Sequence, residues 1–260
     1  MSALMSAQLM CADRSPPALN AARRSAAAPA ESLATIAILR DLPHDTLASL
    51  ARRCAWRRFA AGQTILHYRD NRRAVFFVVQ GRASVLYHSA SGREVRFGEI
   101  EGGDVFGEFA AIDGAPHMAD VVCVADALVA VMPAELFREV LRSHASVSVA
   151  VLRRLTGIAR AMSRRVVEFS TLPVRHRVHA ELLRLAPIGA ADRPHAVIAP
   201  APTHAEIASR ISTHREAVSR EIAELMRHRL VERRDGALVL RDVRALERMV
   251  EQALEEPAIE

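Results

Sequence analysis

The sequence predicts an α+β protein built from a β-rich N-terminal domain, a long helix, and a smaller helical domain with a β-hairpin. Short β-rich runs separated by glycines fill residues 56–132, an apolar 3-4 repeat occupies 152–169, and a capped helical segment with an Asp-Gly turn covers 203–240. Because these patterns follow one another without overlap, we expect four segments. They are a disordered tail (1–34), a β-domain (35–142), a dimerisation helix (143–172) and a C-terminal helical domain (173–260).

The composition is that of a globular protein with an excess of positive charge. Of the 260 residues, 50% are hydrophobic and 25% are charged, and the formal net charge is +5. The chain has no lysine, so arginine supplies all of its strongly basic side chains. This apolar content is sufficient for a packed core. The basic balance fits a nucleic-acid partner without requiring one.

Several protein classes are disfavoured by what the sequence lacks. Its three cysteines, Cys11, Cys54 and Cys123, are too dispersed for a C-x-x-C metal motif and odd in number for a disulfide framework. Scattered thiols favour a cytoplasmic protein. No apolar run is long enough for a membrane span. Without a P-loop, a nucleophile elbow or a metal-ligand cluster, we expect no enzyme, no catalytic residues and no metal site.

The N-terminal half is expected to be mainly β-structure after the tail. Residues 1–34 are rich in Ala, Ser, Pro and Arg and show no periodicity, and a short helix is expected at 41–53. The runs that predict strands are 64–66, 75–79, 83–87, 95–97 and 121–131. Glycines and polar turns separate these runs, which predicts a β-sandwich or barrel.

A long helix with a regular apolar stripe should follow. Its stripe residues recur at spacings of 3, 4, 3, 4 and 3, and they are Leu152, Leu155, Ala159, Met162, Val166 and Phe169. This is the a/d seam of a coiled coil. The stripe could pack on its own domain, but its regularity after a self-contained β-domain favours a homodimer. Pro173 then ends the helix and marks a hinge.

The strongest functional signal is a pair of short helices within 203–227. Thr203 and Glu206 form a capping box at the start of the first helix. A tight turn at 212–213 separates it from the second helix, which starts near His214. The inward face of the second helix is formed by Val218, Ile222 and Leu225.

The outward face of the second helix has the chemistry of a DNA reader. It presents Arg215, Glu216, Ser219 and Arg220 within its first two turns, where a recognition helix contacts base edges. Arginine can donate two hydrogen bonds to guanine, and glutamate can accept one from cytosine. The alternative is a solvated helix face held by ion pairs between residues one turn apart.

A hairpin downstream favours the DNA-binding interpretation. Asp235-Gly236 lies between the strand-like runs 230–231 and 238–240, which is a strong hairpin signal. A hairpin after a recognition helix forms a wing, and Arg233 and Arg234 could reach the DNA backbone from it. A final amphipathic helix is expected at 243–254.

In this order, the parts resemble the CRP/FNR family over residues 35–255. The segments that carry the resemblance are GGDVFGEFAAIDGAP at 102–116, the long helix with its seam, and the helix pair with T-x-x-E-I-A and R-E-A-V-S-R. The resemblance implies an N-terminal cyclic-nucleotide-binding β-roll, a long dimerisation helix and a C-terminal winged helix-turn-helix. It also implies a cytoplasmic, homodimeric transcription regulator with RNA polymerase as a protein partner.

The resemblance assigns roles to residues of the helix pair. Arg215, Glu216 and Arg220 match the family's base-reading residues, which implies a palindromic double-stranded DNA site with TGTGA-like half-sites. Thr203 and His214 stand at its phosphate-contacting positions.

The resemblance also identifies an effector site. Its residues would be Gly107, Glu108, His117, Met118, Met162 and Ser163. Glu108 matches the glutamate that holds a ribose hydroxyl. His117 stands where an arginine holds the cyclic phosphate, and an imidazole lacks the fixed charge and forked donors of a guanidinium. Met162 and Ser163 match two adenine-contacting positions.

The effector therefore stays open at this point. Cyclic AMP or another cyclic nucleotide is favoured by Gly107 and Glu108, whereas a cyclic dinucleotide, another small molecule or no effector is favoured by His117. Haem is a further alternative, with axial ligands drawn from His44, His67, His88 and His117. The function likewise has two alternatives, a constitutive DNA binder with a vestigial pocket and a cyclic-nucleotide-binding module that regulates a partner protein.

Overall fold

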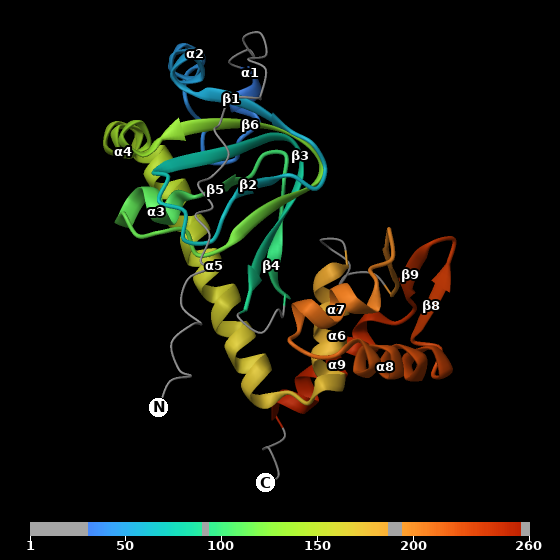
Figure 1. Cartoon of the computed structure of the whole chain (residues 1–260). Coiled ribbons are helices and arrows are strands. Elements are labelled where there is room, and N and C mark those ends of the chain that lie inside the picture. The colour runs from blue at the N-terminus through green and yellow to red at the C-terminus, as the bar shows by residue number, and fades with distance from the viewer. Residues whose placement is uncertain (1–30, 90–93, 187–193, 256–260) are drawn as a thin grey trace, which may run out of the picture.

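A β-rich N-terminal domain and a helical C-terminal domain are joined by one long helix, α5 (Ala145–Thr171), in the computed structural model (Figure 1). The structure describes residues 31–89, 94–186 and 194–255. Most of the expected tail, residues 1–30, lies outside the described residues. Its last four positions form α1 (Glu31–Ala34), and Leu33 is fully buried there. The core of the first domain therefore begins before the expected boundary at residue 35.

The N-terminal domain is a rolled antiparallel sheet. Its strands are β1 (Ala55–Phe59), β2 (Thr64–Leu66), β3 (Ala74–His88), β4 (Glu94–Glu101), β5 (Val105–Phe106) and β6 (Asp120–Pro133). The main path runs β1-β6-β3-β4, while β2 pairs with β6 and β5 pairs with β3. This architecture confirms the α+β fold class and the β-roll.

Two apolar clusters lie on opposite faces of β3. Because side chains alternate along a strand, Val75 and Phe77 pack on one side with helices α2 (His44–Arg53) and α4 (Ala134–Ser143). Phe76 and Val78 point to the other side and fill the interior of the roll. The roll therefore has an outer helical layer and an inner apolar core.

One strand differs from the sequence prediction. The runs 75–79 and 83–87 were expected to be separate, but both belong to β3. The glycine that suggested a turn, Gly81, has a φ of 96°, and its register with β6 shifts on either side of it. A Cβ at Gly81 would lie 2.2 Å from the carbonyl oxygen of Asp126, so this close approach requires glycine.

The C-terminal domain combines helices with a small sheet. Its helices are α6 (Val174–Leu185), α7 (His204–Arg210), α8 (Arg215–Arg227) and α9 (Val243–Glu255), and its strands are β7 (Ala196–Ile198), β8 (Val231–Arg234) and β9 (Ala237–Leu240). The strand order is β7-β9-β8. Asp235 and Gly236 both have positive φ, 50° and 76°, which the two-residue hairpin turn requires.

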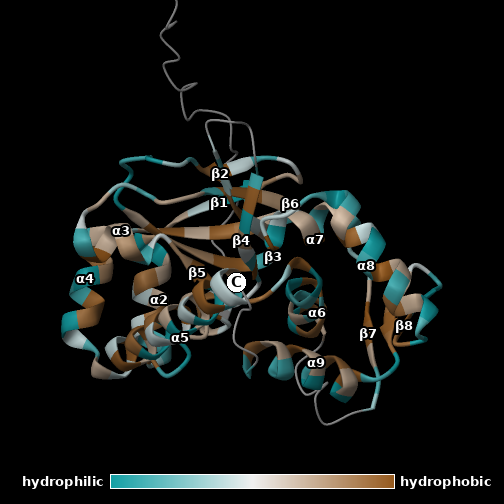
Figure 2. Cartoon of the chain, turned by 90° about the horizontal axis from the view of Figure 1, so that it is seen from below, coloured by the Kyte–Doolittle hydropathy of each residue, from teal (hydrophilic) through white to brown (hydrophobic). Residues whose placement is uncertain are grey.

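The two domains lie beside each other, with the end of β4 against α7 (Figure 1). Pro173 caps α6 and follows the buried Leu172, so the chain turns sharply after α5. The hydropathy view shows apolar residues concentrated in the strands of the roll (Figure 2). Among the described residues, no helix combines the length and the apolar character that crossing a membrane requires.

Candidate nucleic-acid interface and ligand cavity

The helix pair α7–α8 begins with the capping box that the sequence predicts. The Thr203 hydroxyl accepts a hydrogen bond from the Glu206 backbone N–H at 3.2 Å. The Glu206 carboxylate accepts from the Thr203 backbone N–H at 2.8 Å. These bonds satisfy two backbone donors that would otherwise lack partners, and they hold the pKa of Glu206 below its usual value. Ser212, at φ 53°, makes the turn into α8.

The three charged side chains at the start of α8 are free. Arg215, Glu216 and Arg220 are exposed. None of them has a hydrogen bond or ion pair to any residue in the described ranges. The inward face, with Val218, is buried in the domain core. The alternative of a helix face held by ion pairs is therefore not what the geometry shows, because Glu216 and Arg220 do not pair.

Ser219 is tied to the wing through His204, a residue that the sequence analysis did not single out. The Arg233 guanidinium donates from Nη2 to His204 Nε2 at 2.8 Å. Because that nitrogen accepts, the ring proton sits on Nδ1, which donates to the Ser219 hydroxyl at 2.6 Å. Desolvation, followed by Arg233 and Arg215, lowers the pKa of His204. The neutral ring thus links α7, α8 and the wing.

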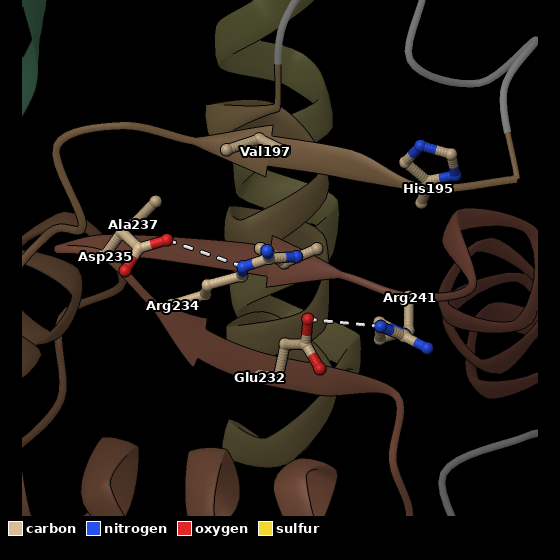
Figure 3. Close-up of a pocket in the computed structure, with 8 residues that line it drawn as sticks. His195, Val197, Glu232, Arg234, Asp235, Ala237 and Arg241 are labelled. Carbon is tan, nitrogen blue, oxygen red and sulfur yellow. Dashed lines mark hydrogen bonds and ion pairs between the residues drawn. The ribbon is translucent and has the colours of Figure 1, made fainter.

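The outer face of the wing sheet is lined by paired charges (Figure 3). Arg241 Nη1 donates to Glu232 at 3.1 Å, and Arg234 Nε lies 3.4 Å from Asp235. Val197, which is 45% exposed, lies on β7 of the same sheet. Of the two wing arginines in the sequence prediction, Arg233 is therefore held toward the helix pair, and Arg234 pairs with the turn.

A cavity in the β-roll brings together most of the expected effector residues. It is lined by residues of β2 to β6, α3 (Glu108–Asp113), the loop after α3, and α5. Five of the six expected residues line it, namely Gly107, Glu108, His117, Met118 and Met162. Ser163 is not among its lining residues, and its hydroxyl donates to the Ala159 carbonyl oxygen of its own helix. Of the four candidate haem ligands, only His117 lines the cavity.

Gly107 and Glu108 are positioned by the start of α3. Gly107 has a φ of 82°, and a Cβ there would lie 2.8 Å from the Ala74 carbonyl oxygen. Glu108 follows as a buried carboxyl with 3% of its surface exposed. Desolvation raises its pKa, and Arg154 on α5 opposes this, with Nε 3.5 Å from Oε1. Arg154 had no role in the sequence analysis, and the contact links the cavity to the long helix.

His117 is buried and committed to the protein backbone. Its Nε2 lies 2.7 Å from the Arg72 carbonyl oxygen and donates to it. Its ring also lies edge-on to Phe76, with 6.4 Å between the centroids. Met118 beside it is 66% exposed. The imidazole of His117 therefore has a structural role in the wall of the cavity.

Comparison with known proteins agrees with this arrangement. The cyclic nucleotide-binding domain family matches residues 56–144, and the Crp-like helix-turn-helix domain family matches residues 176–249. The chain is 26% identical over 203 residues to the cAMP-activated global transcriptional regulator Vfr of Pseudomonas aeruginosa, covering 75% of this chain and 92% of Vfr. It is 28% identical to the CRP-family transcriptional regulator TTHB099 of Thermus thermophilus, with a TM-score of 0.59 and coverage of 76% and 98%.

The fold is also shared with more distant structures. A CooA mutant from Carboxydothermus hydrogenoformans superposes with a TM-score of 0.69 at 17% identity, covering 82% of this chain and 94% of that one.

The chain belongs to the CRP/FNR family. It is a DNA-binding transcription regulator with a cyclic nucleotide-binding domain and a winged helix-turn-helix.

The long helix of this CRP/FNR regulator leaves much of its expected seam exposed. Leu152 is 62% and Val166 65% exposed, and Met162 is 40% exposed. Leu155 differs, because it packs against the core of its own β-domain. Phe169 lies against Arg165 and Arg177 at 5.5 Å and 5.6 Å from its ring centre. Part of the stripe therefore packs against its own chain, and the rest forms an exposed apolar face.

A buried carboxylate joins the long helix of the regulator to its DNA-binding domain. Glu181 on α6 is fully buried. Arg165 on α5 donates to it at 2.8 Å, Arg184 donates to the same oxygen, and Arg210 Nε on α7 lies 3.8 Å from the other. A buried charge needs such partners, because desolvation otherwise makes it costly. Local sequence patterns gave no signal for this cluster.

Proposed function

We propose that this regulator binds a palindromic DNA site as a homodimer and reads bases with Arg215, Glu216 and Arg220. The observation that carries this proposal is that the three side chains are exposed and unpaired on one face of α8, although charged neighbours elsewhere on the helix pair with each other. Thr203 and His214 at the helix starts are suited to phosphate contacts. The TGTGA-like half-site follows from the resemblance of these residues to the family motif.

The exposed stripe of α5 supports the homodimer. Leu152, Met162 and Val166 would be an unfavourable apolar surface on an isolated chain. A second copy of the same helix presents a matching stripe, as a twofold interface requires. Such a dimer would place two α8 helices to read two half-sites. RNA polymerase is proposed as the protein partner on the strength of the family alone.

Small-molecule control is supported by where the cavity lies. Arg154, Ile158 and Met162 of α5 line it, so a ligand there would touch the proposed dimer helix. Ligand binding would then favour one geometry of the hinge at 171–174 over another.

A cyclic nucleotide is one candidate ligand, favoured by Gly107 and Glu108. A constitutive DNA binder with a vestigial pocket is the second candidate function, favoured by His117.

Selection of binding sites from random double-stranded DNA tests the base-reading proposal. We expect a palindrome, and we expect Arg220→Ala to cost about 1–3 kcal/mol on it and to relax base preference. Arg227→Ala is the matched control, because Arg227 is exposed at the far end of the same helix and pairs with Glu224. Equal weakening of Arg220→Ala on all sequences would contradict base reading.

A further inference from the structure

The walls of the β-roll cavity are mainly apolar. The cavity encloses about 440 Å³, which is within the usual range for small-molecule sites. Its inner wall consists of the buried residues Leu66, Ile100, Phe106 and Val121. Three large apolar lining residues that lie outside the α5 stripe are also exposed, Phe97, Phe109 and Met118. Exposed apolar side chains gathered around a concave site indicate an apolar ligand.

The ionisable groups of the cavity do not favour an anion. Its carboxylates are Glu99, Glu108 and Asp113. Arg154 is the single guanidinium among the described lining residues, and it is already engaged. It donates to the Val105 carbonyl oxygen at 2.6 Å and lies 3.5 Å from both Asp104 and Glu108. Glu99 is already paired with Arg210 at 2.6 Å, so Glu108 and Asp113 are the carboxylates that a phosphate would meet, without an uncommitted guanidinium among the described lining residues to offset their repulsion.

His117 does not replace the missing cation. Its Nε2 is used by the Arg72 carbonyl oxygen, and the residue is only 6% exposed. Turning that nitrogen toward a ligand would therefore break the hydrogen bond to the Arg72 carbonyl oxygen.

Glu108 offers the cavity a hydrogen-bond acceptor. Its contact with Arg154 is 3.5 Å, longer than the roughly 2.7–2.9 Å of a strong charge-assisted hydrogen bond. A carboxyl group accepts hydrogen bonds at its oxygens in either protonation state, so Glu108 retains capacity for a ligand O–H or N–H. In a buried site, such a single polar contact would orient an otherwise apolar molecule.

We propose that this cavity binds an uncharged, largely apolar small molecule whose hydroxyl or N–H group donates to Glu108, and that it discriminates against phosphate-bearing ligands. This inference rests on the proposed small-molecule control, and it specifies the class of ligand. The apolar walls supply most of the affinity, and the carboxylates exclude anions. A cyclic nucleotide, whose phosphate carries a negative charge, is the competing occupant.

Displacement of an uncharged fluorescent probe tests the proposal. N-phenyl-1-naphthylamine emits more strongly in apolar sites, and we expect its emission to rise with the full-length protein. We expect 1-naphthol to displace it at a concentration at least tenfold lower than 1-naphthyl phosphate, which differs only by the phosphate group. Cyclic AMP should displace it no better than the phosphate. No rise in emission, or equal displacement by 1-naphthol and its phosphate, would overturn the proposal.

A variant of Met118 and a matched control locate the probe and test the role of charge. Met118 is 66% exposed, so substitution there should leave the fold intact. Met118→Arg should weaken probe binding and improve displacement by 1-naphthyl phosphate relative to 1-naphthol. Val124→Arg should behave as the wild type, because Val124 is an exposed residue of β6 that does not line the cavity. Unchanged probe emission with Met118→Arg would place the probe outside the cavity and contradict the proposal.

DNA binding is measured separately on the same samples by fluorescence anisotropy. Loss of sequence-specific DNA binding would contradict the proposed function but would leave the ligand preference standing. Normal DNA binding that 1-naphthol does not alter, together with tight 1-naphthol binding, would support the ligand class and contradict ligand control.

Discussion

Arg210 on α7 donates a hydrogen bond from Nη2 to the Glu99 carboxylate on β4, with 2.6 Å between Nη2 and Oε1. Glu99 also lines the β-roll cavity, and Arg210 Nε lies 3.8 Å from the buried Glu181. Nearby, the Ser209 hydroxyl donates to the Glu94 carbonyl oxygen at 3.2 Å. A short path of charged groups thus runs from the cavity wall to the first helix of the helix pair.

This pair should contribute to docking of the two domains. A double-mutant cycle of Glu99→Ala and Arg210→Ala should give a coupling energy of about 0.5–1 kcal/mol, because both side chains are partly exposed. The measurement is thermal unfolding by scanning calorimetry. A cycle with Glu101→Ala in place of Glu99→Ala is the control, since Glu101 is an exposed residue of the same strand. Equal coupling in both cycles would argue against a specific docking contact.

His204 should act as a positioning residue for the wing and α8. Replacing it with alanine removes the hydrogen bonds to Arg233 and Ser219, and each is worth about 0.5–1.5 kcal/mol. We therefore expect His204→Ala to weaken DNA binding by at least fivefold. Titration of labelled DNA by fluorescence anisotropy measures this loss.

Two conservative variants test the two hydrogen bonds of His204 separately. His204→Gln places an amide oxygen near the position of Nε2 and should retain the bond from Arg233. His204→Asn places an amide nitrogen near the position of Nδ1 and should retain the bond to Ser219. Both should bind DNA better than His204→Ala. If all three variants bind as the wild type does, His204 has no positioning role.

The sequence predicts those parts of the fold that depend on neighbouring residues. The capping box at Thr203 and the Asp235-Gly236 turn were both predicted and are confirmed, because each is encoded within a few residues. Gly81 misled the prediction, because a glycine that breaks a strand and one that permits close strand approach have the same local appearance. Only the pairing with β6 distinguishes them.

The hydrogen bonds and ion pairs between elements could not be predicted in this way. Glu99 and Arg210 are separated by 111 residues, and Arg233 and His204 by 29. The chain is rich in arginine and glutamate, so composition does not select one partner over another. Glu181 is an extreme case, because a glutamate on an amphipathic helix is normally expected at the surface. Only tertiary packing determines these pairs.

The exposed α5 stripe predicts a sharp dependence of dimerisation on Val166. Val166→Glu would place an unpaired charge in a buried apolar interface and should weaken the dimer at least tenfold, or about 1.4 kcal/mol. Sedimentation velocity over a range of protein concentrations measures this. Val197→Glu is the control, since Val197 is an exposed apolar residue of the wing sheet far from α5 in the sequence. An unchanged sedimentation profile for Val166→Glu would contradict a dimer interface formed by the α5 stripe.

The buried pair of His179 and Glu221 should make the C-terminal domain sensitive to acid. His179 on α6 is fully buried, and its Nε2 lies 2.6 Å from Glu221 Oε1 on α8. Its ring also faces His176, and Arg175 lies close enough to act on it. Desolvation lowers the pKa of His179 below its ordinary value of 6.5, although Glu221 opposes this shift.

The sign of the effect follows from proton linkage. Because the folded state disfavours the proton, the unfolded state binds more protons once the pH falls below about 6.5. The free energy of unfolding should therefore decrease as the pH drops through that value and level off below the pKa of the folded state. Urea denaturation followed by circular dichroism would show this at a series of pH values from about 7.5 to about 5.5, one unit on either side of the ordinary histidine pKa.

His179→Gln is the matched variant, because glutamine keeps an N–H donor for Glu221 but does not titrate. We expect its free energy of unfolding to depend less on pH over the same range than that of the wild type. Replacement of the exposed His228, which pairs with Glu224 at the end of α8, should leave the pH dependence close to that of the wild type. If His179→Gln loses stability on acidification as steeply as the wild type does, the acid sensitivity arises from other groups.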